Sequence, residues 1–515
     1  MILKKNDSPT INKYLFSLLL IFSVIFDNIV QAKTVQTKTV QTPNIVIIYT
    51  DDLGIGDVSS YEAGKLSTPN IDSIASQGIK FTNGYATAAT CTPSRYSILT
   101  GQYPWRKGAK ILPGDAPLLI DPDQETLPKM LKKAGYNTAV IGKWHLGLGN
   151  GAVDWNKYIA LNPNDIGFDY SFIMAATNDR VPNVYVKNGH VVGLEKDDPL
   201  YVSYKDNFPG EPTGIDNPEL LTKMTFSNGH FHSINNGISR IGWQKGGKSS
   251  QWIDEEMSDL FLKEAQEYVK TNKNSPFFLF YTLHQPHVPR VPNPRFVGKS
   301  GQGPRGDAIL EADWAIGEFL KTLDEQGLAE NTLVVFSSDN GPVLDDGYND
   351  QSVSKLGKHT PSGNYRGGKY SLFDAGVHVP FLVRWKGKIS QGSSDALISQ
   401  HDFLASFASL TGQNISISDS QNLLNVILGK STVGRKSLVT QALGGRTAYR
   451  EDNWLFIPAY WGDERLAKEN IETGACSCYQ LYDLAADPSQ QYNLAKKFPE
   501  KTKAMLKAYK NIVDH

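Results

Sequence analysis

Four short apolar runs, rich in β-branched and aromatic residues, constrain the fold of this chain most strongly. None alternates polar and apolar residues as a half-solvated strand does, and segments with helical spacing separate the runs. This pattern is typical of parallel strands that are buried on both faces. It predicts an α/β fold with strands at 44–49, 138–141, 277–283 and 332–336.

Helix signals lie between and beyond these runs. Residues 68–78 begin with Thr-Pro-Asn and end with Gly, which are residue types expected at the two ends of a helix. We expect a second helix over 91–101 and a third over 307–326, where apolar residues recur on one face. A final helix is expected near 501–513.

The chain is long enough for one large domain and a smaller one. Its 515 residues exceed the size at which a single hydrophobic core stops growing. Residues 151–270 are rich in Asn, Gly, Asp and Pro, which predicts long insertions that shape a substrate cleft. The pattern then changes to shorter strands, so we expect a catalytic domain over 43–385 and a smaller domain over approximately 386–515.

The N-terminus has the features of an export signal. Three lysines precede an apolar run over 14–26, and small residues follow up to Ala32. The alternative is an uncleaved membrane anchor, but the run is shorter than a bilayer span and Asp27 interrupts it. We therefore expect a signal peptide over 1–32, export to the periplasm or medium, and no stable membrane anchor. Residues 33–42 are polar and repetitive and predict a flexible leader.

Charge and cysteine content exclude several classes of protein. The formal net charge of -1 gives no global field for a polyanion, so no nucleic-acid partner is expected. The cysteines, Cys91, Cys476 and Cys478, are too few for a disulfide scaffold and lack neighbouring zinc ligands. Cys476 and Cys478 could bridge or remain thiols.

Oxygen-bearing side chains follow two of the predicted strands. Asp51 and Asp52 come after the first run, and Asp339 and Asn340 after the fourth. Either pair alone is common in turns. Both pairs would lie at the carboxyl ends of strands in one sheet, where α/β proteins bind ligands. Their chemistry favours calcium or magnesium over zinc.

A second group of residues can bind an anion and move protons. Lys143 and His145 follow the second run, and His284 and His287 follow the third. Lys369 ends an Arg-Gly-Gly-Lys sequence. Each residue alone is commonly solvated or simply hydrogen-bonded, but the flanking glycines of the two lysine segments permit close approach to a ligand.

Cys91 opens the sequence Cys-Thr-Pro-Ser-Arg at the start of a predicted helix. A helix N-terminus and Arg95 would lower the pKa of its thiol, so a thiolate nucleophile is one interpretation. A buried, inert cysteine is another.

Cys91-x-Pro93-Ser94-Arg95 with Leu99-Thr100-Gly101 resembles the signature of the type I formylglycine-dependent sulfatases of the alkaline phosphatase superfamily. Other matching blocks occur in family order over most of the chain: 51–54, 142–147, 284–287, 338–341 and 366–369. The resemblance implies an alkaline-phosphatase-like, mixed but largely parallel sheet flanked by helices, with a smaller C-terminal α+β domain. One departure is Asp374-Ala375-Gly376, where members often have Glu-Gly-Gly, and it bears on local packing.

The resemblance also implies roles for the matching residues. Cys91 would be oxidised to formylglycine by a maturation enzyme. It would share one calcium ion with Asp51, Asp52, Asp339 and Asn340. Arg95 and Lys143 would orient the formylglycine and the sulfate, and His145 would assist breakdown of the sulfated intermediate. His287 and Lys369 would bind sulfate, and one of them would protonate the departing alcohol.

Hydrated formylglycine carries two hydroxyl groups on one carbon. One hydroxyl would attack sulfur, and deprotonation of the other would expel sulfate and restore the aldehyde. Serine and cysteine lack this second step, so replacement of Cys91 by Ser or Ala predicts loss of turnover.

Residues 175–186 are similar to the corresponding segment of bacterial carbohydrate sulfatases. The expected substrate is a sulfated oligo- or polysaccharide, such as algal ulvan or a sulfated galactan. Candidate sugar contacts are Asp179, Arg180, His232 and His284, whereas His230 and His401 are expected to be structural or exposed. The alternatives are a phosphatase or phosphodiesterase of the same superfamily and a catalytically inactive carbohydrate-binding paralogue.

Overall fold

The computed structural model describes residues 42–61 and 66–514. The predicted signal peptide lies outside the described residues, as does the predicted leader except for Thr42. Residues Pro43–His515 form one compact unit. None of the helices in the described part of the chain is long and apolar enough to cross a membrane.

A mixed ten-stranded sheet forms the centre of this unit. The four predicted strands are confirmed as β1 (Asn44–Thr50), β4 (Asn137–Lys143), β12 (Phe277–Thr282) and β13 (Thr332–Ser338). They are neighbours in the order β13-β1-β12-β4, and all are parallel. In this register Ile47 lies between Phe280 and Val335 on one face, and Ile48 lies between Tyr281 and Phe336 on the other, so apolar side chains cover both faces.

Shorter strands extend the sheet on both sides. β5 (Tyr170–Met174) continues the parallel part beyond β4, and antiparallel β6 (Tyr185–Lys187) and β7 (His190–Val191) end that side. On the other side lie β14 (Phe381–Arg384), β2 (Gly78–Phe81) and β15 (Gly392–Ser394). The antiparallel pairs make the sheet mixed, as expected.

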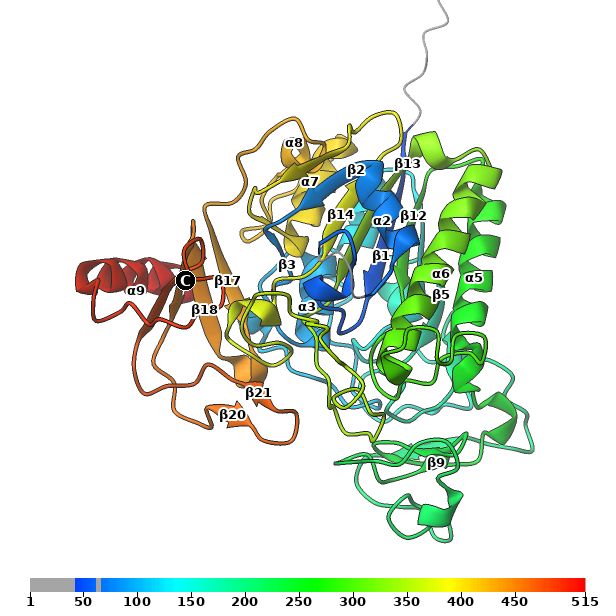
Figure 1. The fold of residues 1–515 in the computed structure, drawn as a ribbon. Coiled ribbons are helices and arrows are strands. Elements are labelled where there is room, and N and C mark those ends of the chain that lie inside the picture. Colours follow the sequence, from blue (N-terminus) through cyan, green and yellow to red (C-terminus); the bar gives the residue numbers. More distant parts are fainter. Residues whose placement is uncertain (1–41, 62–65, 515) are drawn as a thin grey trace, which may run out of the picture. The chain divides into compact units, whose positions relative to one another are not determined.

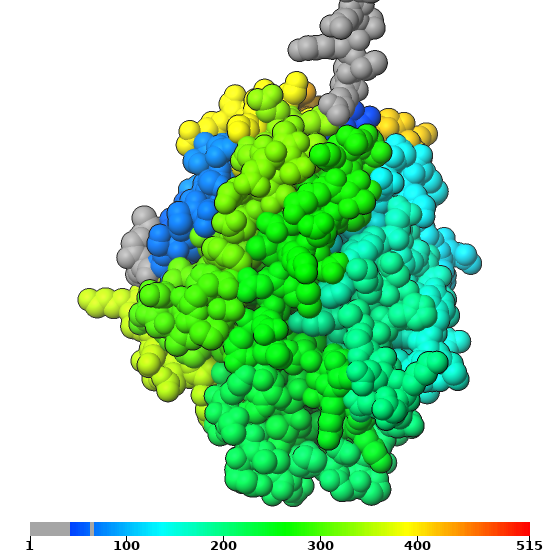
Figure 2. Space-filling model, turned by 90° about the vertical axis from the view of Figure 1, so that its right-hand side faces the viewer, coloured from blue at the N-terminus to red at the C-terminus, as the bar shows by residue number. Residues whose placement is uncertain are grey.

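Helices cover both faces of this sheet (Figure 1). On one face are α2 (Pro69–Ser76), α5 (Met257–Asn272) and α6 (Gly303–Glu325), whose apolar residues pack with Val46 and Ile48 of β1. Figure 2 shows the surface along which the green helices α5 and α6 run. On the other face are α3 (Cys91–Thr100), α4 (Leu127–Lys133) and α7 (Phe403–Leu410), which pack with Ile45 and Ile47.

The region predicted to be insertions, 151–270, ends in a helix of the main domain. It carries the short strands β8 (Tyr201–Ser203), β9 (Ile234–Asn235), β10 (Ile238–Ser239) and β11 (Trp243–Lys245). Its last part belongs to α5, whose apolar residues face the sheet. The polar composition of the whole stretch concealed this helix.

The C-terminal part contains a second, antiparallel sheet. Its order is β17 (Ser437–Gln441), β18 (Thr447–Glu451), β19 (Trp454–Ile457) and β22 (Gln480–Asp483), and α9 (Pro499–Val513) packs against it. Residues after 385 contribute to both sheets, because β15 and α7 belong to the large sheet and its helices. The predicted domain boundary therefore stays a prediction.

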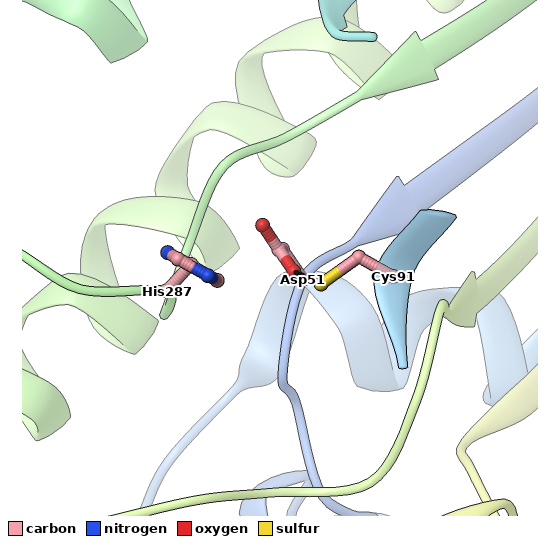
Figure 3. A group of neighbouring side chains, drawn as sticks. All are labelled: Asp51, Cys91 and His287. Carbon is pink, nitrogen blue, oxygen red and sulfur yellow. Dashed lines mark hydrogen bonds between the residues drawn. The ribbon is translucent and has the colours of Figure 1, made fainter. Parts of the chain in front are cut away.

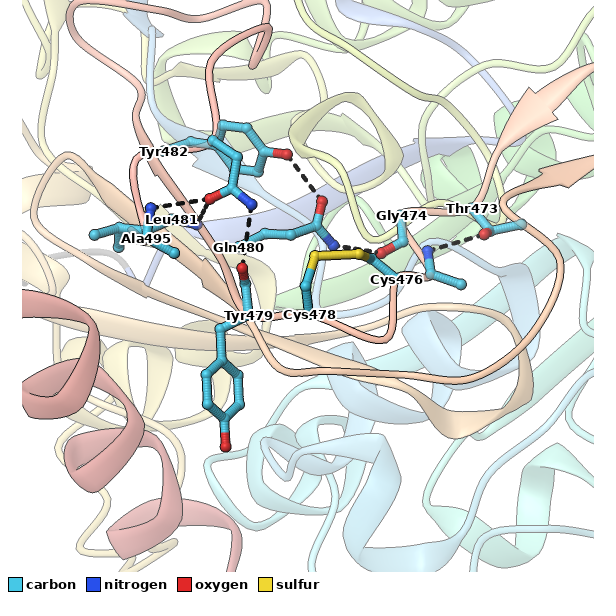
Figure 4. The surroundings of a disulfide bond; sticks show 11 residues. Thr473, Gly474, Cys476, Cys478, Tyr479, Gln480, Leu481, Tyr482 and Ala495 are labelled. Atoms are coloured by element: carbon cyan, nitrogen blue, oxygen red, sulfur yellow. Dashed lines mark hydrogen bonds between the residues drawn. A yellow bond between two sulfur atoms is a disulfide. The ribbon is translucent and has the colours of Figure 1, made fainter. Parts of the chain in front are cut away.

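In the sequence, a hairpin of β20 (Arg465–Leu466) and β21 (Ile471–Glu472) lies between β19 and β22. A disulfide joins Cys476 to Cys478 directly after it, which answers the question that the sequence left open. Figure 4 shows the bridge beside Gly474, whose carbonyl accepts a hydrogen bond from the Gln480 amide at 2.7 Å. The remaining short elements are β3 (Gly84–Tyr85), β16 (Ile398–Ser399) and α8 (Leu424–Ile427).

Candidate active site

The carboxyl ends of the parallel strands and the N-terminus of α3 meet at one point. Asp51 follows β1, His287 lies on the segment after β12, and Cys91 is the first residue of α3 (Figure 3). The Cys91 Sγ lies 3.5 Å from Asp51 Oδ1. The sheet therefore brings together residues that are far apart in the sequence, as its predicted topology requires.

Three carboxylates and the Cys91 sulfur form a compact group of candidate metal ligands. One ligand atom each from Asp51, Asp52, Cys91 and Asp339 lies within 4.8 Å of the others, and all four side chains are buried. Asn340 is adjacent, because its amide nitrogen donates to Asp52 Oδ1 at 2.7 Å. Its own Oδ1 is buried without a hydrogen-bond partner among the described residues.

This group of ligands fits a hard divalent cation. Burial raises the pKa of Asp51 and also that of Asp52, because the charged carboxylates have lost their water. A bound cation would offset that cost, and the unpartnered Asn340 oxygen is a further ligand of the type that calcium prefers. Zinc would favour nitrogen and sulfur ligands instead.

Three cations surround the carboxylates. The Lys143 ammonium contacts Asp51 and lies 3.9 Å from Asp339. Arg95 donates from Nε to Asp339 Oδ2 at 2.9 Å. Lys369 donates to Asp52 at 2.9 Å and to Asp346 at 2.8 Å. Burial alone would lower the pKa of Lys369, but these two carboxylates outweigh burial and raise it, so the side chain stays charged.

The two site histidines have defined tautomers when neutral. His145 Nε2 donates to the Leu112 carbonyl at 2.9 Å, which leaves Nδ1 unprotonated and without a hydrogen-bond partner in the described chain. His287 Nδ1 donates to the Val288 carbonyl at 2.7 Å, which leaves Nε2 unprotonated, 3.9 Å from Asp52. Burial, followed by nearby lysines, lowers the pKa of both rings, so each is neutral at pH 7.

Three residues of this site have strained backbones. Asp52, His145 and Tyr370 have φ angles of 61°, 56° and 76°, which are costly for residues with a side chain. Such strain persists where the surrounding structure holds a functional residue in one position.

The structure contradicts the thiolate interpretation of Cys91. Burial raises the pKa of its thiol well above the ordinary value, and Asp51 and Asp339 add to this effect although Lys143 opposes it. The helix N-terminus and Arg95 do not compensate for the loss of solvent. An unmodified Cys91 is therefore a protonated thiol and a weak nucleophile.

A small cavity of about 50 Å³ opens onto Cys91, His145, His287 and Lys369. Asp179 and Arg180, both candidate sugar contacts, line it and pair at 2.7 Å. The other lining residues are Ile111, His230, Ile241, Asp346 and Tyr370.

Several lining residues were not predicted. His230, expected to be structural, donates from Nε2 to the Asp179 carboxylate at 2.9 Å. Asp346 accepts from Lys369 and from the Tyr370 hydroxyl, the latter at 2.9 Å. Asp346 has no motif around it, so only its contact with Lys369 identifies it.

Two candidate sugar contacts do not line the cavity. His284 packs near Phe261, and burial lowers the pKa of its ring to about 3. His232 stacks on Trp243 with ring centroids 4.0 Å apart and accepts from the Gly242 amide at 2.9 Å. His401, expected to be structural or exposed, is buried against Tyr103.

The departure at Asp374-Ala375-Gly376 affects packing beneath the lysine loop. Asp374 accepts from His378 Nδ1 at 2.8 Å and from the Tyr85 hydroxyl at 3.0 Å. The Gly376 carbonyl accepts from the Gly341 amide at 2.9 Å, next to Asn340. This segment therefore holds the backbone next to Asn340 in place.

Known proteins show the same sequence pattern. The family model described as Sulfatase matches residues 43–413. The N-acetylgalactosamine-6-O-sulfatase of Bacteroides thetaiotaomicron is 50% identical over 470 residues, which cover 89% of this chain and 90% of the relative. The steryl-sulfatase of Rattus norvegicus is 30% identical over 514 residues, which cover 88% of this chain and 85% of the relative.

A solved structure from work on the metabolism of multiple glycosaminoglycans by Bacteroides thetaiotaomicron has the same fold. It superposes with a TM-score of 0.91 at 48% sequence identity, and the match covers 92% of this chain and 100% of that one. This likeness and the mixed sheet confirm the alkaline-phosphatase-like architecture. The chain belongs to the sulfatase family of sulfuric ester hydrolases.

Proposed function

We propose that this chain is an exported enzyme that hydrolyses sulfate esters of carbohydrates, with a formylglycine made from Cys91 and one calcium ion. The lining of the cavity is the observation that carries the choice of a carbohydrate. Asp179 and Asp346 face the same small space as Lys369. Carboxylates repel a sulfate, so they are suited to accept hydrogen bonds from hydroxyl or amide groups of the remaining substrate.

The small apolar share of the cavity lining also favours a carbohydrate substrate. Only Ile111 and Ile241 present aliphatic side chains there, whereas most of the lining residues can form hydrogen bonds. A sterol or a simple aryl group would add no hydrogen bonds to this polar lining, whereas the hydroxyl and amide groups of a sugar can.

The proposed chemistry divides between bound groups and side chains. Calcium, held by Asp51, Asp52, Asp339, Asn340 and the modified Cys91, supplies positive charge for the sulfate oxygens. Hydrated formylglycine supplies the attacking hydroxyl and a second hydroxyl for sulfate release.

The chain's own side chains bind the sulfate and move the protons. Lys143, Arg95 and Lys369 place positive charge around the sulfate. His145 takes a proton at its unpartnered Nδ1, which suits the release step. Lys369, which stays charged, returns a proton to the departing alcohol, and His287 accepts a hydrogen bond at its unprotonated Nε2.

We propose a 6-O-sulfated N-acetylgalactosamine unit as the preferred substrate, because the 50% identical relative bears that activity in its name. The test measures sulfate release from N-acetylgalactosamine 6-sulfate, its 4-sulfate isomer, sulfated galactan and ulvan oligosaccharides, and a phosphate monoester. We expect the 6-sulfate to be the best substrate. Preference for the galactan or ulvan fragments would replace this substrate, faster phosphate release would favour the phosphatase alternative, and binding without turnover would indicate an inactive paralogue.

After coexpression with a formylglycine-generating enzyme, peptide mass spectrometry should show Cys91 as formylglycine. Cys91→Ala and Cys91→Ser should both lose turnover, because neither residue offers the second hydroxyl. Multiple turnovers at the normal rate by Cys91→Ser would contradict the proposal.

A further inference from the structure

An exposed tryptophan lies on the segment that leads from β19 to the β20–β21 hairpin. The side chain of Trp461 is 86% exposed, more than any other large hydrophobic residue among those described. The flat apolar face of such a side chain can pack against a ligand.

Arg446 lies directly beside Trp461. Its Nη2 donates to the Trp461 carbonyl at 2.9 Å. A Cβ at position 462 would clash with the guanidinium, so Gly462 leaves the space that this group needs. Two other arginines of this region, Arg366 and Arg465, both pair with Glu472. Arg446 forms no ion pair with the described residues, so its charge remains available to a ligand.

The segments that carry this pair of residues are hydrogen-bonded to segments that line the catalytic cavity. Arg446 is at the turn between β17 and β18, and Leu443 in that turn donates its amide to the carbonyl of Tyr370, which lines the cavity. On the other side, Lys468 at the tip of the hairpin donates to Asn228 at 2.6 Å, two residues from His230. Figure 1 shows β20 and β21 beyond the ends of β17 and β18.

The segment under Trp461 is already ordered. The Tyr460 amide donates to the Cys476 carbonyl at 2.8 Å, and the Tyr460 hydroxyl donates to the Thr447 carbonyl at 2.9 Å. Thr473 binds the carbonyls of Asp463 and Glu464. The disulfide at Cys476 closes the same segment. A preformed platform of this kind avoids the entropic cost of ordering a loop when a ligand binds.

We propose that Trp461 and Arg446 form a second subsite, for the sugar next to the sulfated unit, and that this neighbouring sugar carries a carboxylate. The inference rests on the proposed function, because the cavity must first hold the sulfated sugar. The cavity of about 50 Å³ leaves no space for a second ring, so a neighbour must pass over the rim. The aromatic face packs on the sugar ring, and the planar guanidinium pairs with a carboxylate.

Three substrates test this subsite: a 6-sulfated N-acetylgalactosamine, the same unit linked to a uronic acid, and the same unit linked to a neutral hexose. Each is assayed with the native chain, Trp461→Ala and Arg446→Gln. The matched controls are Tyr492→Ala, which removes an aromatic side chain that is 72% exposed, and Lys436→Gln, which removes an exposed cation outside the cavity lining. Melting temperatures check that each variant is folded.

We expect both subsite variants to lower kcat/KM for the uronic acid disaccharide about tenfold, mainly through KM, and to leave the monosaccharide rate unchanged. Arg446→Gln should spare the neutral disaccharide, whereas Trp461→Ala should impair it too. Equal losses on all three substrates, or no loss on either disaccharide, would overturn the subsite. A native chain that releases no sulfate from any of the three would instead remove the proposed function on which the subsite rests.

Discussion

Gly142 is the residue on which the position of Lys143 depends most directly. It is the last residue before Lys143 in β4, its φ is 116°, and a Cβ there would lie 1.8 Å from the Thr282 carbonyl oxygen. An added methyl group would therefore force β4 away from β12 and displace the Lys143 ammonium from Asp51.

We predict that Gly142→Ala lowers the free energy of unfolding by about 1–3 kcal/mol and reduces sulfate release at least tenfold. Urea unfolding and initial-rate assays measure the two effects. Gly108→Ala is the matched control, because Gly108 also has a positive φ, 64°, but a Cβ there would meet nothing within 4 Å. Equal behaviour of the two variants would show that crowding at Gly142 has no role.

Individual site residues were predictable where a motif or a strand end marked them. Asp51, Asp339 and Lys143 follow buried runs, so the topology alone brings them together. Asp346 and His230 lie in irregular loops whose course depends on tertiary contacts, and no periodicity marks them. The prediction of a lowered pKa for the Cys91 thiol was wrong, because the degree of burial that raises this pKa is a property of the folded chain.

Among the elements, helix α2 depends on a side chain from α6. Asp313 accepts hydrogen bonds from the backbone amides of Asn70 at 3.0 Å and Ile71 at 2.8 Å, which are free donors in the first turn of α2. It also accepts from the Asn70 side-chain amide at 2.7 Å. Burial raises the pKa of Asp313 to about 6.

This shift predicts a pH dependence of stability. The folded pKa exceeds the ordinary value of 3.8, so folding favours the protonated form. The stabilising contribution is complete below about pH 4 and is lost as the pH rises through about 6. Asp313→Asn stays neutral, so its stability relative to the native chain should increase by about 1–3 kcal/mol from pH 4 to pH 7. Denaturant unfolding at several pH values measures this difference.

Asp324→Asn is the control on the same helix, since Asp324 is about half exposed and pairs with Lys386. It should show no comparable trend. A difference between Asp313→Asn and the native chain that is constant with pH would refute the role given to burial at Asp313.

Elements with a strong local signal were predicted well. The central strands were evident because burial on both faces makes them continuously apolar, and α6 because its apolar residues recur on one face. Strands β6 and β7 and the strands of the β20–β21 hairpin are two or three residues long, too short for any period to appear. Their positions come from tertiary pairing.

For the whole molecule, the buried carboxylates predict that stability depends on the proposed cation. Asp51, Asp52 and Asp339 approach one another in the core without solvent. A ligand that binds only the folded chain stabilises it by about 2.7 kcal/mol at a hundred times its dissociation constant. We therefore predict that a calcium chelator lowers the melting temperature by several degrees and that added calcium restores it.

Calorimetry of the chelated protein, titrated with calcium or magnesium, checks this prediction. Calcium should restore the melting temperature at a lower concentration than magnesium. Asp51→Asn should respond more weakly, since it removes one charged ligand. A melting temperature that neither the chelator nor calcium changes would rule out the proposed ion.

The burial of Cys91 constrains when another enzyme could modify it. Its side chain is only 2% exposed, and the whole of α3 is enclosed by the large sheet and its neighbouring helices. The active site of another protein cannot reach a sulfur atom that is buried in this way. An enzyme that makes the proposed formylglycine would therefore have to reach Cys91 before α3 packs into the folded chain.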